Sequence, residues 1–280
     1  MTRLAIRAPA KINLGLEITR RRTDGYHDVV TILQALEFGD TVHISHATSI
    51  DGISSVHGLS QDRDLVFRAA RNLHCRIHPR TGVYIQVEKR IPVAAGLGGG
   101  SSNAGAILRG LHVLWNTNWP AIHATARSLG TDIPFFLQPG TTLGLGRGDE
   151  LQTLPPAPPR WVILARPHQK ISTIDAYTNL RPEEYSGGRA TLATARNIEN
   201  GKLEPELLKN DLQAAAIRLV PEVADVLHAL EDVGAQPALL SGSGATCFGL
   251  FPDKDAAQTA ETKLKSHNWW MMTTRFLRPG

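Results

Sequence analysis

The chain of 280 residues is long enough to bury a sizeable core and to form two lobes. Its apolar and charged fractions, 42% and 20%, are ordinary for a globular protein. A formal net charge of +4 suits a polyanionic ligand but is too diffuse to require nucleic acid. No apolar run approaches the roughly 20 residues of a membrane span, so no membrane partner is expected. The two cysteines, Cys75 and Cys247, have no zinc-ligand spacing, and we expect both to be packing residues in the cytoplasm.

The N-terminal segment has the pattern of strands. Apolar residues alternate with others over residues 4–8 and 12–18, which predicts two strand segments with a bend at Pro9 between them. Lys11 and Asn13 follow this bend. From residue types alone they are either solvent-exposed side chains or members of a site.

A turn signal at Asp24-Gly25 precedes Tyr26 and His27. An aromatic face can stack on a nucleobase and an imidazole can hydrogen-bond its edge, so the pair suits a base-binding site. The alternative is a half-buried pair that opens the next strand. Arg20–Arg22 indicate a solvated turn or, alternatively, a patch that binds nucleic acid.

The densest glycine cluster follows a strand expected at residues 83–88. Residues 92–105 read PVAAGLGGGSSNAG, with four glycines within five positions. Such a cluster is costly in a structural role but lets a backbone approach a ligand closely. Ser101 and Ser102 are suitable N-caps for a helix that follows, and a helix N-terminus favours phosphate. The loop fits neither the Walker A pattern nor the dinucleotide fingerprint, and a flexible connector is the alternative.

Helices are expected on either side of this loop. Residues 64–73 are amphipathic, with Asp64 as an N-cap or first-turn residue. Residues 120–130 form a second helix, with Pro120 at its first position and a glycine after its end. Asp132, two residues before a proline, suits the N-cap of a further helix.

The second half begins after a short proline-rich connection, Pro155–Pro159. A buried strand is expected from Trp161, a helix over 255–265 and a closing strand over 273–277. Residues 241–246 read SGSGAT between two apolar runs, which is typical of a turn between strands.

Three segments resemble the motifs of the GHMP kinases: Ala8–Leu14 the first, Pro92–Ser102 the second and Ser241–Thr246 the third. The resemblance implies that the second motif wraps the triphosphate of ATP and that the third packs beside it. The ATP-binding residues it implies are Pro92, Val93, Ala94, Ala95, Gly96, Leu97, Gly98, Gly99, Gly100, Ser101 and Ser102. It also implies an α+β, two-lobed GHMP kinase fold. Residues 1–155 would form an ATP-binding lobe like the second domain of ribosomal protein S5, and residues 156–280 a C-terminal α+β lobe.

The segment Asp24-Gly-Tyr-His27 resembles one family within that superfamily, the 4-diphosphocytidyl-2-C-methyl-D-erythritol kinases. In that family, the tyrosine and histidine hold the cytosine of the substrate, which would be Tyr26 and His27 here. Asn13, Thr173 and Tyr177 complete the expected substrate-binding set. The family has asparagine where this chain has Asp64, so the adenine contact is not carried over.

The resemblance also implies the chemistry. Asp132 matches the family's catalytic base and Lys11 its partner, in phosphoryl transfer from ATP to the C2 hydroxyl of the erythritol unit. Mg²⁺ is expected with ATP, with a hydroxyl such as that of Ser102 or solvent completing its shell, because no carboxylate pair or other protein metal site is evident. The expected partner is a small cytidine diphosphate compound and not nucleic acid, and the protein would be a monomer or weak homodimer. The alternatives are another GHMP kinase, acting on mevalonate or homoserine, or an RNA-binding protein with an S5-like lobe that uses Arg20–Arg22.

Overall fold

The computed structural model describes residues 3–56 and 58–278, and the chain forms two compact units. Unit 1 holds the residues through Ala10, Phe38–Val93 and Gly98–Pro139, and unit 2 holds Lys11–Glu37, Ala94–Leu97 and the residues from Gly140 onward. Neither unit is contiguous, because the long strands β1 (Arg3–Arg21) and β2 (His27–Ala47) contribute to both. The expected α+β class is confirmed. The predicted boundary between residues 155 and 156 stays a prediction.

Strand β1 is continuous through Pro9, so the predicted division into two strand segments is wrong. The neighbouring strand provides the reason. A Cβ atom on Gly39 of β2 would lie 2.4 Å from the Ala8 carbonyl oxygen and 2.7 Å from the Pro9 Cα. The absence of a side chain at Gly39 therefore lets β2 approach the proline closely enough for β1 to continue through it.

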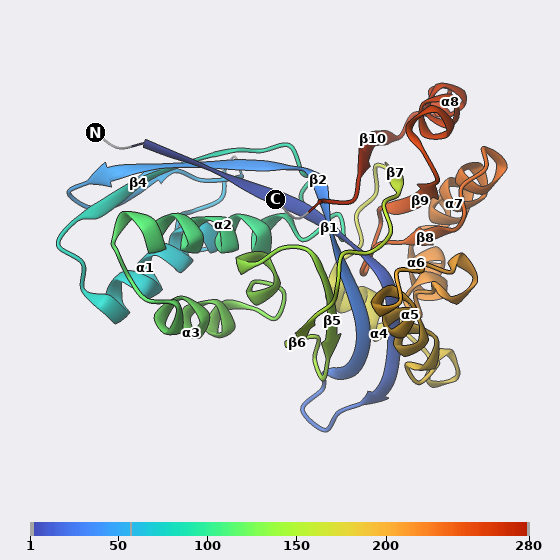
Figure 1. The fold of residues 1–280 in the computed structure, drawn as a ribbon, viewed down its shortest axis with the longest axis horizontal. Helices are drawn as coiled ribbons and strands as arrows, with labels where there is room; N and C mark the ends of the chain where they lie inside the picture. Colours follow the sequence, from blue (N-terminus) through green and yellow to red (C-terminus); the bar gives the residue numbers. More distant parts are fainter. Residues whose placement is uncertain (1–2, 57, 279–280) are drawn as a thin grey trace. The chain divides into compact units, whose positions relative to one another are not determined.

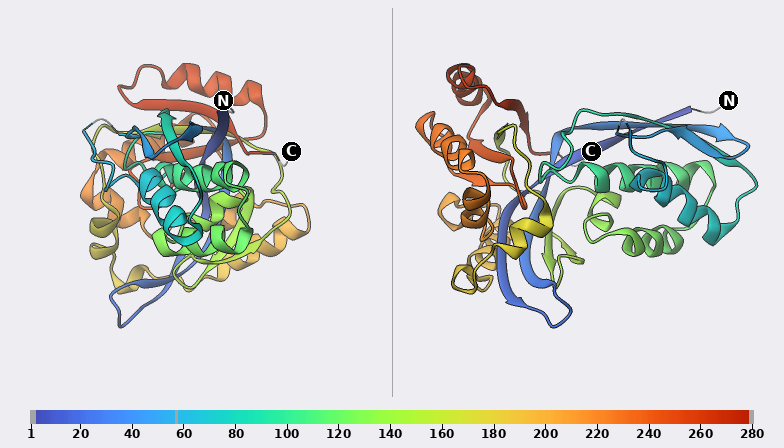
Figure 2. Two further views of the ribbon diagram at one scale, coloured as in Figure 1. Left: turned by 90° about the vertical axis from the view of Figure 1, so that its left-hand side faces the viewer. Right: turned by 180° about the vertical axis from the view of Figure 1, so that it is seen from behind.

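Unit 1 packs three helices on strands (Figure 1). Strand β4 (Gly82–Glu88) pairs antiparallel with residues 41–47 of β2, and β3 (Ile50–Ile53) pairs parallel with β4. Helices α1 (Leu65–Ile77), α2 (Gly99–Leu114) and α3 (Trp119–Leu129) lie along one face of these strands, as the views in Figure 2 also show. The core between them is apolar and fully buried, and includes Val66, Phe67, Leu73, Val83, Ile85, Ile107, Leu108 and Leu111.

The caps of two helices in unit 1 test the sequence patterns. The N-cap of α1 is Asp64, whose carboxylate accepts a hydrogen bond from the Val66 N–H at 3.1 Å, as predicted. Helix α3 begins at Trp119, one residue earlier than predicted, because the Asn118 side chain caps it by accepting from the Ala121 N–H. Pro120 is thus the second residue of the helix, a position where a missing N–H is also harmless.

Unit 2 contains two sets of strands. Residues 31–34 of β2 pair with β5 (Thr141–Leu145), which forms a hairpin with β6 (Glu150–Thr153). A second, antiparallel sheet has the order β10-β7-β9-β8. These four strands are β7 (Trp161–Arg166), β8 (Ala238–Leu240), β9 (Cys247–Phe251) and β10 (Trp270–Arg275). The helices of this unit are α4 (Thr173–Thr178), α5 (Arg189–Glu199), α6 (Gln213–Leu219), α7 (Glu222–Asp232) and α8 (Lys254–Leu264), with short 3₁₀ turns at Pro182–Glu184 and Pro205–Leu207.

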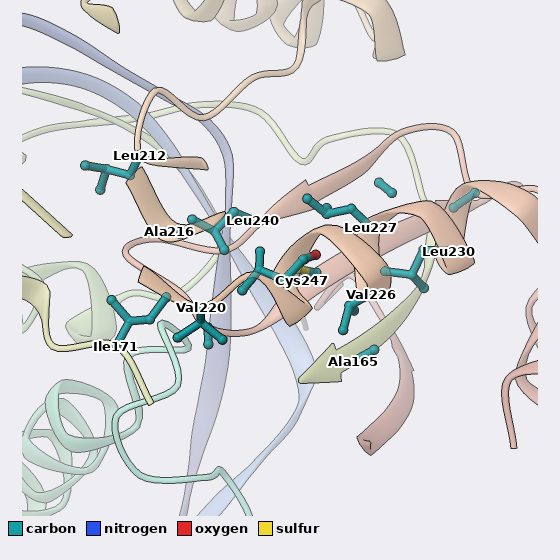
Figure 3. Packing of buried hydrophobic residues seen from close by; sticks show 14 of the residues in the cluster. Ala165, Ile171, Leu212, Ala216, Val220, Val226, Leu227, Leu230, Leu240 and Cys247 are labelled. Atoms are coloured by element: carbon teal, nitrogen blue, oxygen red, sulfur yellow. The ribbon is translucent and has the colours of Figure 1, made fainter. Parts of the chain in front are cut away.

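The core of unit 2 lies between α6, α7 and the second sheet (Figure 3). Val226 and Leu230 of α7 are fully buried in it, together with Leu240 and Cys247 of the sheet. Burial raises the pKa of the Cys247 thiol, so this residue is the inert packing cysteine that was expected. The same expectation is wrong for Cys75, which is exposed in the last turns of α1.

Among the described residues, no helix combines the length and the apolar character needed to cross a bilayer.

Candidate active site

The second motif begins helix α2 of unit 1. The N-cap is Gly98, with φ +69°, and no side chain caps the helix. The first N–H groups of the helix are therefore left for another acceptor, and they lie at the positive end of its dipole. Ser101 and Ser102 are not the N-caps that the sequence predicted. Ser102 is fully buried in the first turn and its hydroxyl donates to the Pro9 carbonyl at 2.6 Å, which ties the second motif to the first.

A lysine that sequence reasoning missed lies at the start of α2. A Cβ atom on Gly99 would be 3.2 Å from the Lys89 Nζ. The ammonium donates to the Asp40 carboxylate at 2.6 Å, and the N–H groups of Arg90 and Ile91 donate to the same buried carboxylate at 2.6 and 2.7 Å. Asp40 thus holds a cation beside the helix N-terminus. The sequence does offer a signal for this lysine, because Lys89 stands three residues before Pro92, the first residue of the second motif.

Asp132 lies in unit 1, between α3 and the 3₁₀ turn η1 (Pro134–Leu137). The N-cap of that turn is Ile133, so the N-cap interpretation of Asp132 is wrong. The carboxylate is half-buried and, within the described residues of its own unit, makes no hydrogen bond or ion pair. A Cβ atom on Gly105 of α2 would lie 2.5 Å from the Phe136 Cβ, so α2 and η1 are packed closely. Unit 1 therefore carries the predicted base on a segment adjoining the glycine-loop helix.

Unit 2 brings together parts of all three motifs. The Lys11 N–H donates to the Leu97 carbonyl at 3.0 Å, and the Ser241 hydroxyl donates to the Gly96 carbonyl at 3.1 Å. A Cβ atom on Gly96 would lie 2.1 Å from the Ser241 carbonyl oxygen, and one on Gly242 would lie 3.0 Å from the Lys11 Nζ. The predicted packing of the third loop beside the second is thus confirmed, and glycine is what allows it.

Lys11 is buried, 5% exposed, at one end of a hydrogen-bonded series. Its Nζ donates to the Asn13 Oδ1 at 2.7 Å, the Asn13 Nδ2 donates to the Thr31 Oγ1 at 2.8 Å, and the Thr31 hydroxyl donates to the Gly15 carbonyl at 2.7 Å. The series fixes the orientation of the Asn13 amide and holds the ammonium in one place. Lys11 and Asn13 are therefore components of a buried polar arrangement and not exposed side chains.

An aromatic cluster forms around His27 in unit 2. The rings of His27 and Tyr177 are 5.2 Å apart between centroids, and those of His27 and Tyr185 are 5.8 Å apart. Tyr26 is 56% exposed, and the Arg147 guanidinium carbon lies 4.4 Å from its ring centroid. Tyr26, His27 and Tyr177 were expected from the sequence. Tyr185 was missed because it lies in no motif.

Burial and, secondarily, the charge of Arg21 lower the pKa of His27, so its neutral imidazole is favoured at physiological pH. A neutral imidazole has one donor nitrogen and one acceptor nitrogen, which suits it to the mixed donor and acceptor edge of a nucleobase.

Thr173, the other expected substrate contact, is the first residue of α4. Its hydroxyl is 3.1 Å from that of Ser243 in the third motif. This places two hydroxyl groups side by side in unit 2. Ser243, like Lys89 and Tyr185, is a residue that sequence reasoning did not single out.

The arginines of the β1–β2 turn are largely committed to carboxylates. Arg20 pairs with Asp28, and Arg22 pairs with both Asp28 and Asp24. These contacts leave the guanidinium groups less available to an RNA backbone and favour the interpretation as a solvated turn.

Within the described residues, no three His, Cys, Asp or Glu side chains gather in a way that could hold a metal ion. This is compatible with Mg²⁺, which proteins commonly bind through substrate phosphates and water with few protein ligands.

Comparison with protein families gives two matches. Residues 64–140 match the N-terminal domain of the GHMP kinases, and residues 191–268 match their C-terminal domain. Two curated relatives are each described as a 4-diphosphocytidyl-2-C-methyl-D-erythritol kinase. The relative from Shouchella clausii is 39% identical, over 88% of this chain and 85% of its own length. The relative from Pelotomaculum thermopropionicum is 37% identical, over 97% of both chains.

Solved structures agree with this assignment. A crystal structure of 4-(cytidine 5′-diphospho)-2C-methyl-D-erythritol kinase superposes with a TM-score of 0.87, at 31% identity over 99% of this chain and all of that one. Homoserine kinase from Cytophaga hutchinsonii has the same fold, with a TM-score of 0.73 and 18% identity over 99% of this chain and 95% of that one. On these similarities the chain belongs to the 4-diphosphocytidyl-2-C-methyl-D-erythritol kinases, ATP-dependent phosphotransferases among the GHMP kinases.

Proposed function

We propose that this enzyme transfers the γ-phosphoryl group of ATP to the C2 hydroxyl of 4-diphosphocytidyl-2-C-methyl-D-erythritol, a step of isoprenoid precursor synthesis by the non-mevalonate route. The names of relatives 34–39% identical support this substrate. The structural observation that carries it is the aromatic cluster of unit 2, where His27 packs against Tyr177 with the exposed ring of Tyr26 next in sequence. Such a cluster offers ring faces for stacking on cytosine and an imidazole for its polar edge. Asn13 and Thr173 would bind the remainder of the substrate.

The phosphates of ATP would be held by residues Pro92–Ser102. Support comes from the uncapped N-terminus of α2, where several N–H groups point in one direction with the helix dipole behind them. Lys89 would add a positive charge at that point, since it lies against Gly99.

Asp132 would accept the proton of the C2 hydroxyl. The hydroxyl oxygen forms a bond to the γ-phosphorus, the bond from that phosphorus to the bridging oxygen breaks, and ADP leaves. Lys11 would offset the negative charge on the transferred group, which is how preorganised cations assist such transfers.

Mg²⁺ would accompany the nucleotide and neutralise phosphate charge. Ser102, which the sequence suggested as a contributor to its shell, is a poor candidate, because the hydroxyl is fully buried and donates to the Pro9 carbonyl. The hydroxyl of Ser101, half-buried in the same turn, is the better candidate.

We further propose that the enzyme acts in the cytoplasm as a monomer or weak homodimer and does not bind nucleic acid.

A coupled assay of ADP release tests the function. The purified enzyme is given MgATP with one acceptor at a time: the cytidyl methylerythritol substrate, mevalonate, homoserine or galactose. We expect turnover with the first alone, and inhibition of that turnover by cytidine nucleotides. Turnover with mevalonate or homoserine instead would assign the enzyme to another branch of the superfamily. Retention on RNA that is lost steeply with salt, without ADP release, would favour the nucleic-acid alternative.

A further inference from the structure

Tyr185 contacts the imidazole of His27 in two ways. Its hydroxyl oxygen is 3.2 Å from the His27 Nε2, within hydrogen-bond distance. Its ring also meets the imidazole edge-on, with an interplanar angle of 89°. One nitrogen of the imidazole is therefore occupied by a protein group, and only Nδ1 remains to meet a ligand.

The backbone beside Tyr185 is fixed by two buried carboxylates. The hydroxyl oxygen of Ser186, the next residue, is 2.7 Å from Glu17 and 2.8 Å from Asp211, so the two carboxylates share its one proton, and the Ser186 N–H donates to Asp211 at 3.1 Å. Glu17 is 1% exposed and Asp211 is 7% exposed. The Tyr185 N–H itself donates to the Pro182 carbonyl at 3.2 Å. These bonds hold the tyrosine in place and make it a rigid support for the imidazole.

The identity of the nitrogen that carries the proton matters for base recognition. A neutral histidine exists as two tautomers. A phenol hydroxyl donates more strongly than it accepts, so Tyr185 at Nε2 favours the tautomer that carries its proton on Nδ1. Cytosine presents an acceptor at N3 and a donor at N4. Uracil presents a donor at N3 and an acceptor at O4. An imidazole fixed in one tautomer distinguishes the two bases, whereas one that exchanges freely between tautomers can adapt to either.

We propose that Tyr185 is a positioning residue for base specificity: it fixes the ring plane and the tautomer of His27, and so makes the base subsite select cytosine over uracil. The inference rests on the proposed function, because it requires that His27 meets the base of the substrate. Tyr185 itself need not touch the ligand.

The Tyr185→Phe variant tests this, since it removes the hydroxyl and keeps the ring that packs on His27. Binding of cytidine 5′-diphosphate and of uridine 5′-diphosphate is measured by calorimetry, and turnover by ADP release. We expect cytidine diphosphate to bind about tenfold more weakly, as for loss of one hydrogen bond, with the preference over uridine diphosphate falling by a similar factor. The KM for the substrate should rise while kcat changes by less than about threefold.

Two further measurements separate positioning from a general structural effect. Nitrogen-15 NMR of labelled histidine should show one tautomer of His27 in the native enzyme and a mixture in Tyr185→Phe. In a His27→Ala background, adding Tyr185→Phe should cause no further loss of binding. Tyr84→Phe is the matched control, because Tyr84 is an exposed tyrosine on β4 in unit 1 and is expected to change nothing.

An unchanged preference for cytidine diphosphate in Tyr185→Phe would overturn the inference, and so would an additive loss in the His27→Ala background. Either result leaves the proposed function intact if the native enzyme still binds cytidine diphosphate and phosphorylates its substrate. Failure of the native enzyme to bind cytidine diphosphate would overturn both.

Discussion

Asp132 is a half-buried carboxylate without a partner among the described residues of its unit, on a segment packed against α2. Lys11 is the reverse case, a buried cation whose position is fixed by Asn13. A base that must accept a proton is better left without strong hydrogen bonds, whereas a cation that stabilises developing charge is better held rigidly. The two environments fit the two proposed roles.

Replacing the carboxylate by an amide of the same shape tests the role of Asp132. In Asp132→Asn, we expect kcat to fall by about 10²–10⁴-fold, because general-base assistance is lost. The affinities for ATP and cytidine diphosphate should stay within about twofold, since the fold and both ligand sites are retained. Steady-state kinetics and calorimetry measure the two quantities. Asp232→Asn, at the exposed end of α7, is the control. Turnover of Asp132→Asn at the native rate would remove Asp132 from the mechanism.

At the residue scale, sequence alone singled out most of the residues of the proposed site, because each stands in a motif. Lys11, Asn13, Tyr26, His27 and Tyr177 were all singled out in this way. Tyr185 and Ser243 could not be found because each acquires its role only through a contact with a residue far away in sequence. Ser102 shows the opposite error. Serine favours helix N-caps, but Gly98, which has a positive φ, is the N-cap, and Ser102 therefore lies inside the helix.

Among the elements, the two glycine loops of unit 2 depend on each other for their packing. Gly96 has φ +74°, and a Cβ there would collide with the Ser241 carbonyl. In Gly96→Ala we expect a loss of at least about 1–2 kcal/mol from the positive φ alone. Turnover should also fall sharply, because Ser241 must move away from the loop.

Gly140→Ala is the matched control for this variant, because nothing lies within 4 Å of a Cβ at Gly140 and its φ lies outside the left-handed range. Thermal unfolding and ADP release are measured on both proteins. Equal stability of the two variants would mean that the loops can separate at little cost.

The buried carboxylate of Glu17 joins β1 to α5. Burial alone would raise the pKa of Glu17, but hydrogen bonds from Ser186 and Thr191 outweigh it and leave the pKa below its ordinary value of 4.5. A lowered pKa in the folded state means that the ionised group stabilises the protein above its unfolded pKa. This stabilisation is lost as the pH falls through the folded pKa.

We therefore expect Glu17→Gln to lower the free energy of unfolding at pH 7 by about 1–3 kcal/mol. The difference from the native enzyme should shrink below about pH 4.3, where the unfolded chain takes up the proton. Urea unfolding at several pH values provides the measurement. Glu199→Gln, exposed at the end of α5, should show neither effect. A deficit of Glu17→Gln that is independent of pH would contradict the assignment of charge to Glu17.

For the molecule as a whole, the fold class followed from the resemblance, and the helices with clear caps followed from local pattern. The N-cap at Asp64 is an example. The continuity of β1 through Pro9 could not be predicted from the local pattern, because the space that admits Pro9 is provided by Gly39 on another strand. A proline or a capping residue predicts the conformation of its segment correctly only where packing against neighbouring segments does not impose another conformation.

The two cysteines offer a measurement on the whole protein. Cys75 is exposed, whereas Cys247 is fully buried with a raised pKa. We expect an aromatic disulfide reagent to titrate one thiol in the native enzyme and both in guanidinium, because only a thiolate reacts. Rapid reaction of both thiols without denaturant would mean that the core of unit 2 opens readily.

The discontinuous units have a consequence for the nascent chain. Leu16 of β1 bridges to Asn210, Leu36 of β2 bridges to Phe276, and the Leu277 N–H donates to the Ala35 carbonyl. Translation at about 5–20 residues per second places these partners on the order of ten seconds or more apart. The first hairpin to leave the ribosome must therefore wait, with unpaired edges, for the last residues to emerge. Chaperones that shield strand edges should consequently raise the yield of this enzyme more than its modest size suggests.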